Sequence, residues 1–245
     1  MKKLFCVLLL APALAFGDEA EIRLDTAPIR TDAPSLQAGA RTFVNYCLNC
    51  HSAASVRFNQ LYDIGLTDAQ IKENLLFAAE KTGQSMKVAM APKDAKDWFG
   101  TSTPDLSVIA RSRSADWLYT YFRTFYRDPT RPTGWNNTTF ASVAMPHVLY
   151  TLQGEQALKV EKAEGAHGEA GENAAEKVSF ELVKPGTLSK LEYDNTVADL
   201  VSFLVYIGEP QAHARTQMGK LVLFGLFVLT LLAYLLKREY WRDVH

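Results

Sequence analysis

Cysteine is scarce in this chain of 245 residues, and its scarcity argues against a structural zinc site. Only three cysteines occur, and Cys47 and Cys50 are not accompanied by a second cysteine pair. A structural zinc site needs about four cysteine or histidine ligands in suitable spacing, so the pair lacks a second half with which to form one. A net charge of −1 argues against a nucleic-acid partner. No internal repeat is evident either.

The segment Cys47-Leu48-Asn49-Cys50-His51 has the spacing C-x-x-C-H, the attachment motif of a c-type haem. Two thiols at this spacing can add to the two vinyl groups of one haem, and the histidine that follows can bind the iron as an axial ligand. A thioredoxin-like redox pair is the alternative, but it would lie beside a βαβ pattern that we do not find. The motif predicts one covalent haem c, His51 as a metal ligand, and electron transfer.

Residues 1–17 have the composition of a secretory signal peptide. Two lysines precede an apolar run from Leu4 to Leu14, and small residues follow it before Asp18. The run is short for a bilayer span, and an uncleaved anchor is the alternative. Export agrees with haem attachment, because covalent c-type haem is assembled outside the bacterial cytoplasmic membrane.

A second apolar segment lies near the C-terminus and has no charged residue from Leu221 to Leu236. It is about long enough to cross the hydrocarbon of a bilayer, and the basic residues after it mark the cytoplasmic side. We therefore expect a single transmembrane helix at 217–237 in the bacterial inner membrane. A cytoplasmic tail would occupy 238–245, and one periplasmic haem domain would occupy 18–216.

Apolar residues recur at helical spacing in four segments of this domain. The first leads directly into the haem motif, and a capping box of Thr67 and Gln70 opens the second. The expected helices cover Ser35 to Tyr46, residues 68 to about 81, Ala115 to Arg127, and a segment from about Asn195 to Gly208. The long loops between them could wrap a haem, so the fold class is mainly α.

Residues 154–185 differ in composition from the rest of the domain. Leu158 to Val160 and Val178 to Val183 alternate enough to predict a small hairpin insertion. Between them, Gly165 to Glu176 is rich in alanine, glutamate and glycine and should be a flexible loop. Nothing in this insertion suggests a chemical site.

The iron also needs an axial ligand on its second face, and a methionine or a histidine would suit an electron carrier. Met145 precedes Pro146, which limits backbone freedom and helps to hold a thioether rigidly. Met145 is therefore the expected metal ligand, and a thioether there would raise the redox potential. Met86 and Met90 are alternatives, as is His147, which we otherwise expect to be a surface imidazole.

Taken together, these features resemble the cytochrome c1 family, the haem subunits of cytochrome bc1 complexes, in its bacterial form. The similarity covers essentially the whole chain, and the Pro-Asp-Leu-Ser segment, the Met-Pro pair and the tail anchor together are specific. The matching segments are Trp98-Phe99-Gly100, Pro104-Asp105-Leu106-Ser107-Val108-Ile109-Ala110-Arg111, Asp116-Trp117-Leu118-Tyr119, Met145-Pro146, Phe203-Leu204 and Glu209-Pro210.

The resemblance implies a class I c-type cytochrome-like haem domain and a role in the respiratory chain. As a subunit of quinol–cytochrome c reductase without independent turnover, the chain would pass electrons from the Rieske iron–sulfur protein to a cytochrome c. Cytochrome b and a dimeric complex are the further partners that the family implies.

The resemblance also implies that Arg113 approaches a haem propionate and that Pro104 lines the haem wall. Arg111 is a second propionate candidate, and a surface salt bridge is the alternative for both arginines. The chain departs from the family where Ser114-Ala115 stands in place of the frequent glycine pair, and where His147 follows Met-Pro.

Two other functions remain in competition. A membrane-anchored cytochrome c outside any bc1 complex is the alternative within electron transfer, although the segment from Pro104 to Tyr119 and the C-terminal anchor argue against it. A haem-based gas or redox sensor is the alternative from another class. A sensor usually needs an open sixth site and an output module, and the tail after Leu236 is too short for one.

Overall fold

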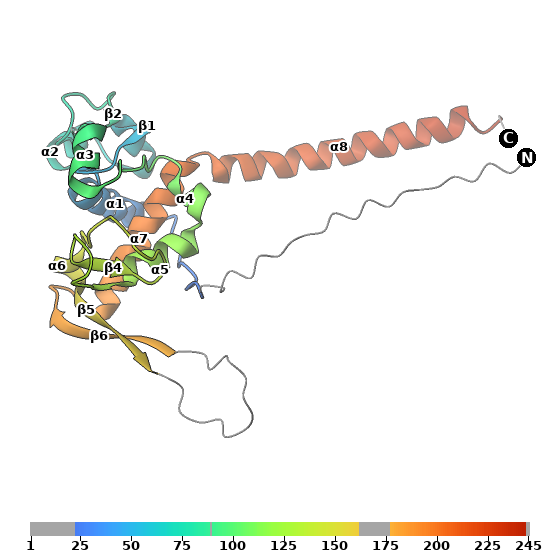
Figure 1. Cartoon of the computed structure of the whole chain (residues 1–245). Coiled ribbons are helices and arrows are strands. Elements are labelled where there is room, and N and C mark those ends of the chain that lie inside the picture. The colour runs from blue at the N-terminus through green and yellow to red at the C-terminus, as the bar shows by residue number, and fades with distance from the viewer. Residues whose placement is uncertain (1–22, 89, 162–176, 244–245) are drawn as a thin grey trace, which may run out of the picture.

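The computed structural model describes residues 23–88, 90–161 and 177–243, so the expected signal peptide and the loop from Gly165 to Glu176 lie outside the described residues. A mainly helical domain is followed by one long helix that projects away from it (Figure 1). The helices are α1 (Ala33–Thr42), η1 (Phe43–Cys47), η2 (Phe58–Ile64), α2 (Asp68–Asn74), α3 (Pro92–Phe99), α4 (Ile109–Arg113), α5 (Ala115–Arg123), α6 (Tyr150–Gln153), α7 (Lys190–Gly208) and α8 (Ala212–Tyr240).

The core forms where α1 crosses α7. Phe43 and Phe203 are fully buried, with ring centroids 5.6 Å apart. The crossing is close because Gly39 has no side chain: a Cβ there would meet the backbone carbonyl of Asp199. Helix α5 packs on the other part of α7, where Tyr193 donates a hydrogen bond of 2.7 Å to the carbonyl of Phe122.

Each of the four predicted helices exists, but all four have different bounds. Helix α1 begins at Ala33, two residues earlier than expected, and continues through η1 to Cys47. Helix α2 begins at the predicted capping box and ends at Asn74, not near residue 81. Helix α5 ends at Arg123 because Phe125 to Arg127 instead pair with Trp135 to Asn137. Helix α7 begins five residues earlier than expected, at a second capping box formed by Ser189 with Glu192.

The strands form three antiparallel pairs. They are β1 (Ala53–Arg57) with β2 (Ser85–Met86), β3 (Phe125–Arg127) with β4 (Trp135–Asn137), and β5 (Gly154–Glu161) with β6 (Lys177–Pro185). The third pair confirms the predicted hairpin and extends it in both directions. The sequence pattern gave no signal for the first two pairs, because each contains a strand of only two or three residues.

Helix α8 contains 29 residues and would be about 43 Å long at 1.5 Å per residue. From Ala214 to Tyr240 it is long and apolar enough to cross a membrane. Its side chains from Leu221 to Tyr240 are all exposed in the isolated chain, as expected for a helix whose surroundings are lipid or another subunit.

Candidate haem site

The haem motif lies at the end of α1, where the helix widens. Residues Phe43 to Cys47 form a π-helical turn, closed by a hydrogen bond of 3.0 Å from the Leu48 amide to the Phe43 carbonyl. Such turns are rare and often occur at functional sites. The carbonyl of Cys47 then accepts hydrogen bonds from the amides of Cys50 and His51, at 3.0 and 2.8 Å. This compact turn presents both thiols and the imidazole to one side.

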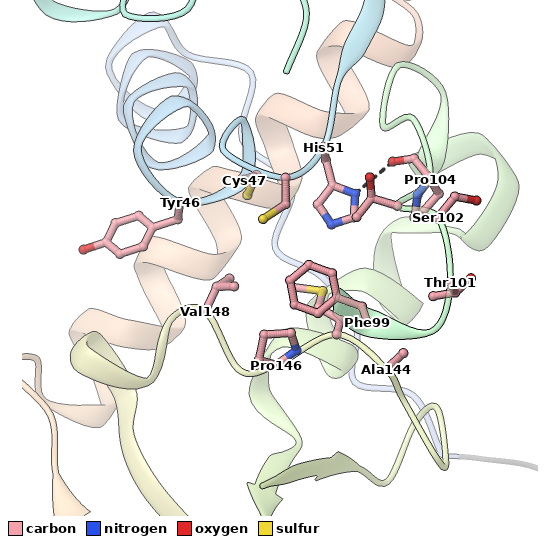
Figure 2. A pocket seen from close by; sticks show the side chains of 13 residues that line it. Tyr46, Cys47, His51, Phe99, Thr101, Ser102, Pro104, Ala144, Pro146 and Val148 are labelled. Carbon is pink, nitrogen blue, oxygen red and sulfur yellow. Dashed lines mark hydrogen bonds between the residues drawn. The ribbon is translucent and has the colours of Figure 1, made fainter. Parts of the chain in front are cut away.

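These side chains face an apolar cavity with about 520 Å³ of empty space, its open mouth included. Figure 2 shows Cys47 and His51 on one side and the chain from Ala144 to Pro146, which contains Met145, across from them. The lining residues are Tyr46, Cys47, Cys50, His51, Phe99, Thr101, Ser102, Thr103, Pro104, Ala144, Met145, Pro146 and Val148. Five of the six predicted site residues therefore meet at one cavity, and only Arg113 does not line it.

His51 is oriented by the wall of the cavity. Its Nδ1 donates a hydrogen bond of 2.8 Å to the carbonyl of Pro104, which assigns the proton to Nδ1 and leaves the Nε2 lone pair free. Burial lowers the pKa of His51, against the opposing effects of the Pro104 carbonyl and of Asp105. A neutral imidazole held by a carbonyl on its other nitrogen is the usual form of a metal-ligating histidine.

The Pro104 carbonyl is itself fixed by the segment that follows it. Asp105 accepts hydrogen bonds of 2.8 Å from the amides of Ala54 and Ser107. Burial raises the pKa of the Asp105 carboxyl, but these hydrogen bonds outweigh it and the net shift is downward. The Ser107 hydroxyl accepts from the Ser55 amide at 3.0 Å. The Pro-Asp-Leu-Ser segment is therefore tied to the residues just after the haem motif, and it holds the imidazole in place.

Met145 is presented by a loop that Asn137 organises. The side chain of Asn137 is 1% exposed, and it donates to the Tyr121 carbonyl at 2.8 Å while accepting from the amides of Thr139 and Phe140. These bonds join strand β4 and the end of α5 to the loop before Met145. With Pro146 limiting the backbone on the other side, the thioether has a fixed approach to the cavity.

The two thiols are free, and their environments differ. Cys47 is 4% exposed, and burial, with a smaller effect of Cys50, raises its pKa to about 12. Cys50 is partly exposed, and burial raises its pKa as well. Before haem is attached, burial therefore favours the neutral form of both thiols. Thiol addition to vinyl groups is compatible with this form, whereas metal binding through sulfur would require deprotonation.

The other proposed axial ligands lie elsewhere. Met86 is fully buried in β2, and neither it nor Met90 lines the cavity. His147 is 2% exposed, so the expectation of a surface imidazole is wrong. Its ring stacks on Phe125 at 4.8 Å and meets the edge of Trp135 at 5.1 Å, although its neighbours Pro146 and Val148 line the cavity.

The two arginines also lie outside the cavity wall. The Arg113 guanidinium lies over the ring of Trp117, 5.1 Å from its centroid. Arg111 lines a separate surface pocket near Tyr206 and Glu209. Ser114, which stands where the family often has glycine, has a φ of 75° and caps α5 by accepting from the Trp117 amide. The backbone conformation that favours glycine is thus kept without it.

Sequence reasoning missed two kinds of residue at this site. Tyr46, Phe99 and Val148 line the cavity, but their apolar character alone could not distinguish them from core residues. Tyr121 lies 24 residues before Met145 and donates a hydrogen bond of 3.4 Å to its sulfur. Only the tertiary structure brings these two residues together.

A helical domain that presents C-x-x-C-H beside an apolar cavity, with an imidazole nitrogen and a thioether facing it, defines a c-type cytochrome. The model of the Cytochrome C1 family matches residues 26–244. The chain therefore belongs to the cytochrome c1 family. It carries one covalent haem c and functions in respiratory electron transport, as the electron-transfer subunit of a reductase complex.

Similarity to individual relatives extends over the full length. The chain is 50% identical over 246 residues to a protein named ammonia monooxygenase gamma subunit from Nitrosomonas europaea, covering 100% of this chain and 99% of that one. It is 45% identical to cytochrome c1 from Allochromatium vinosum, covering 100% of both chains. It is also 24% identical to cytochrome b/c1 from Bradyrhizobium diazoefficiens, over 87% of this chain and 34% of that longer one.

Proposed function

We propose that this chain is the haem subunit of a bc1 complex, which receives electrons from a Rieske iron–sulfur protein and passes them to a cytochrome c. Cytochrome b would be the subunit against which α8 docks. The relative named cytochrome b/c1, in which the matching region is about a third of a longer chain, supports this pairing.

In this proposal, five of the residues that line the cavity have a defined role in holding the haem. Cys47 and Cys50 would hold the haem covalently, and His51 through Nε2 and Met145 through Sδ would bind its iron. When bound, the haem supplies an iron that gains and loses one electron. Pro104 keeps the imidazole oriented through its carbonyl. Because the cavity is apolar, it would favour the less charged ferrous form of a bound haem.

The observation that carries the proposal is the placement of the two axial candidates. His51 and Met145 are 94 positions apart in the sequence, yet both line the same cavity. An iron bound by both this imidazole and this thioether would be suited to electron transfer, because neither position would be left for a gas or a substrate. This arrangement does not favour a sensor.

Arg113 remains a candidate for a haem propionate. Its side chain is exposed, it stacks on Trp117, and it has no ion pair among the residues that the structure describes. The surface salt bridge considered from the sequence is therefore not what holds it.

The proposed topology places residues 18–216 in the periplasm after removal of residues 1–17. Helix α8 would span the inner membrane, and the basic residues at its end, Lys237 and Arg238, would face the cytoplasm. The haem would then lie on the side where a Rieske domain and a soluble cytochrome c can reach it.

Purification in mild detergent tests the proposal. We expect cytochrome b and a Rieske protein to co-purify with the chain, and a quinol to reduce its haem in that preparation. The name of the relative from Nitrosomonas europaea suggests a different assembly, with ammonia monooxygenase subunits. Recovery of those subunits instead of cytochrome b, or of the chain alone with no quinol-driven reduction, would contradict the bc1 assignment.

A further inference from the structure

A buried hydroxyl group faces the sulfur of Met145. Tyr121 is 7% exposed, and its only side-chain hydrogen bond within the described part of the chain is the donation of 3.4 Å to Met145 Sδ. A thioether is a weak acceptor, whereas buried hydroxyl groups usually find good partners. A phenylalanine would fill the same space without the cost of desolvating a hydroxyl. Packing alone therefore does not explain the tyrosine.

The ring of Tyr121 has little freedom to turn away from the sulfur. Trp117 stacks on it, with centroids 4.8 Å apart and planes 12° apart. Phe125 meets it at 5.0 Å in an edge-on arrangement. The Arg113 guanidinium and the ring of Phe140 both lie against Trp117, at 5.1 and 6.3 Å. A continuous stack thus leads from an exposed cation to the hydroxyl that contacts Met145.

We propose that Tyr121 is a positioning residue that orients the Met145 sulfur and raises the redox potential of the haem. This inference rests on the proposed function, because it takes Met145 as the sixth ligand. A sulfur that shares a lone pair with a hydroxyl donates less electron density to the iron. Ferric iron depends on that density more than ferrous iron does, so the hydrogen bond favours the reduced state. Hydrogen bonding behind a ligand is one of the recognised means of tuning a metal site.

The variant Tyr121→Phe removes only the hydroxyl. In the full-length holoprotein in detergent, we expect a lower midpoint potential and a displaced methionine–iron charge-transfer band, with thermal stability kept. Tyr119→Phe is the matched control, because Tyr119 lies on the same helix, is equally buried, and has its ring beneath Arg123 rather than near Met145. This control should leave both the potential and the band unchanged.

A double-mutant cycle tests the role of the stack. Trp117→Leu should lower the potential, as Tyr121→Phe does, because Tyr121 loses the ring that holds it. In the Tyr121→Phe background, the same change should have little further effect, because residues that act through one another are not additive. Independent, additive shifts would show that Trp117 does not act through Tyr121.

The outcomes separate this inference from the ligand assignment. If Met145→Leu alters the band and the potential while Tyr121→Phe leaves both as in the wild type or raises the potential, the role of Tyr121 is refuted and Met145 stands. If Met145→Leu changes neither property, the ligand assignment itself fails.

Discussion

Gly39 of α1 lies so close to Phe203 of α7 that a Cβ on the glycine would stand 2.7 Å from the Cβ of the phenylalanine. This contact sets the distance between the helix that ends at the haem motif and the helix that leads to α8. Gly39→Ala should therefore destabilise the domain by about 1–3 kcal/mol, the usual cost of overpacking a well-packed core.

Thermal unfolding of the holoprotein measures this cost. Gly83→Ala is the matched control, because a Cβ there would meet nothing within 4 Å. Equal stability of the two variants would show that α1 can move away from α7 without loss.

Met145→Leu tests the sixth ligand. The loss of the thioether should abolish the weak methionine–iron charge-transfer band and lower the potential by about 100 mV or more. Axial ligands set haem potentials over a range of roughly 0.8 V. Redox titration and the near-infrared edge of the visible spectrum measure the two effects. Met86→Leu, at a buried methionine outside the cavity, should change neither. If Met145→Leu changed neither property and Met86→Leu changed both, the sixth ligand would be a residue other than Met145.

The covalent link is tested by denaturation. Haem should remain with the polypeptide on a denaturing gel and add the mass of one haem to the mature chain, because Cys47 and Cys50 both face the cavity. Replacing both cysteines by serine should leave no haem-stained band. Complete extraction of haem from the wild type by acidic acetone would contradict attachment through these residues.

Asp68 predicts a pH dependence of stability. Hydrogen bonds from Lys72, Tyr62 and Thr82 lower the pKa of its carboxyl to about 2, from an ordinary value of 3.8. A group whose pKa is depressed by folding contributes its full stabilisation above the unfolded value and loses it as the pH falls toward the folded value. Asp68→Asn should therefore lower the melting temperature at pH 7, and the difference from the wild type should shrink between about pH 4 and pH 2.

The control for this prediction is Asp97→Asn, at an exposed residue with no ion pair in the described part of the chain. Its melting temperature at pH 7 should stay close to that of the wild type, whereas that of the Asp68 variant should be lower. If the melting temperature of the Asp68 variant differed from that of the wild type by the same amount at every pH, the loss of the carboxylate charge would not be the cause.

Truncation before Lys220 tests the anchor. The remaining protein should be soluble, keep its haem spectrum and still reduce cytochrome c when given electrons chemically, because the cavity lies wholly within residues 46–148. It should support little quinol-driven reduction in membranes, because its docking helix is gone. Full quinol-driven activity without associated cytochrome b would contradict the proposed assembly.

Local sequence signals were enough for much of the site. The C-x-x-C-H motif and Met145 before Pro146 are contiguous patterns with a chemical meaning, and their residues do meet at one cavity. The capping box at Thr67 and the apolar stripe of α7 also predicted real helices. Each of these features depends on residues within a few positions of one another.

What the sequence did not reveal depends on distant contacts. His147 is buried because Phe125 stacks on it, and α5 stops early because its last aromatic residues enter a strand pair. The hydrogen bonds from the Ala54 amide to Asp105 and from Tyr121 to Met145 join segments that are far apart in the chain. No periodicity or motif reports such pairs.

The turn between α7 and α8 restricts where the haem can travel. Only three residues, Glu209 to Gln211, separate the two helices, and Arg215 pairs with Glu209 across the turn. Helix α7 is at the same time packed into the core through Phe203. In the proposed complex, so short a connection would leave the haem domain little room to swing between a donor and an acceptor. It would act as a stationary relay, so that the mobile steps of electron delivery and collection belong to its partners.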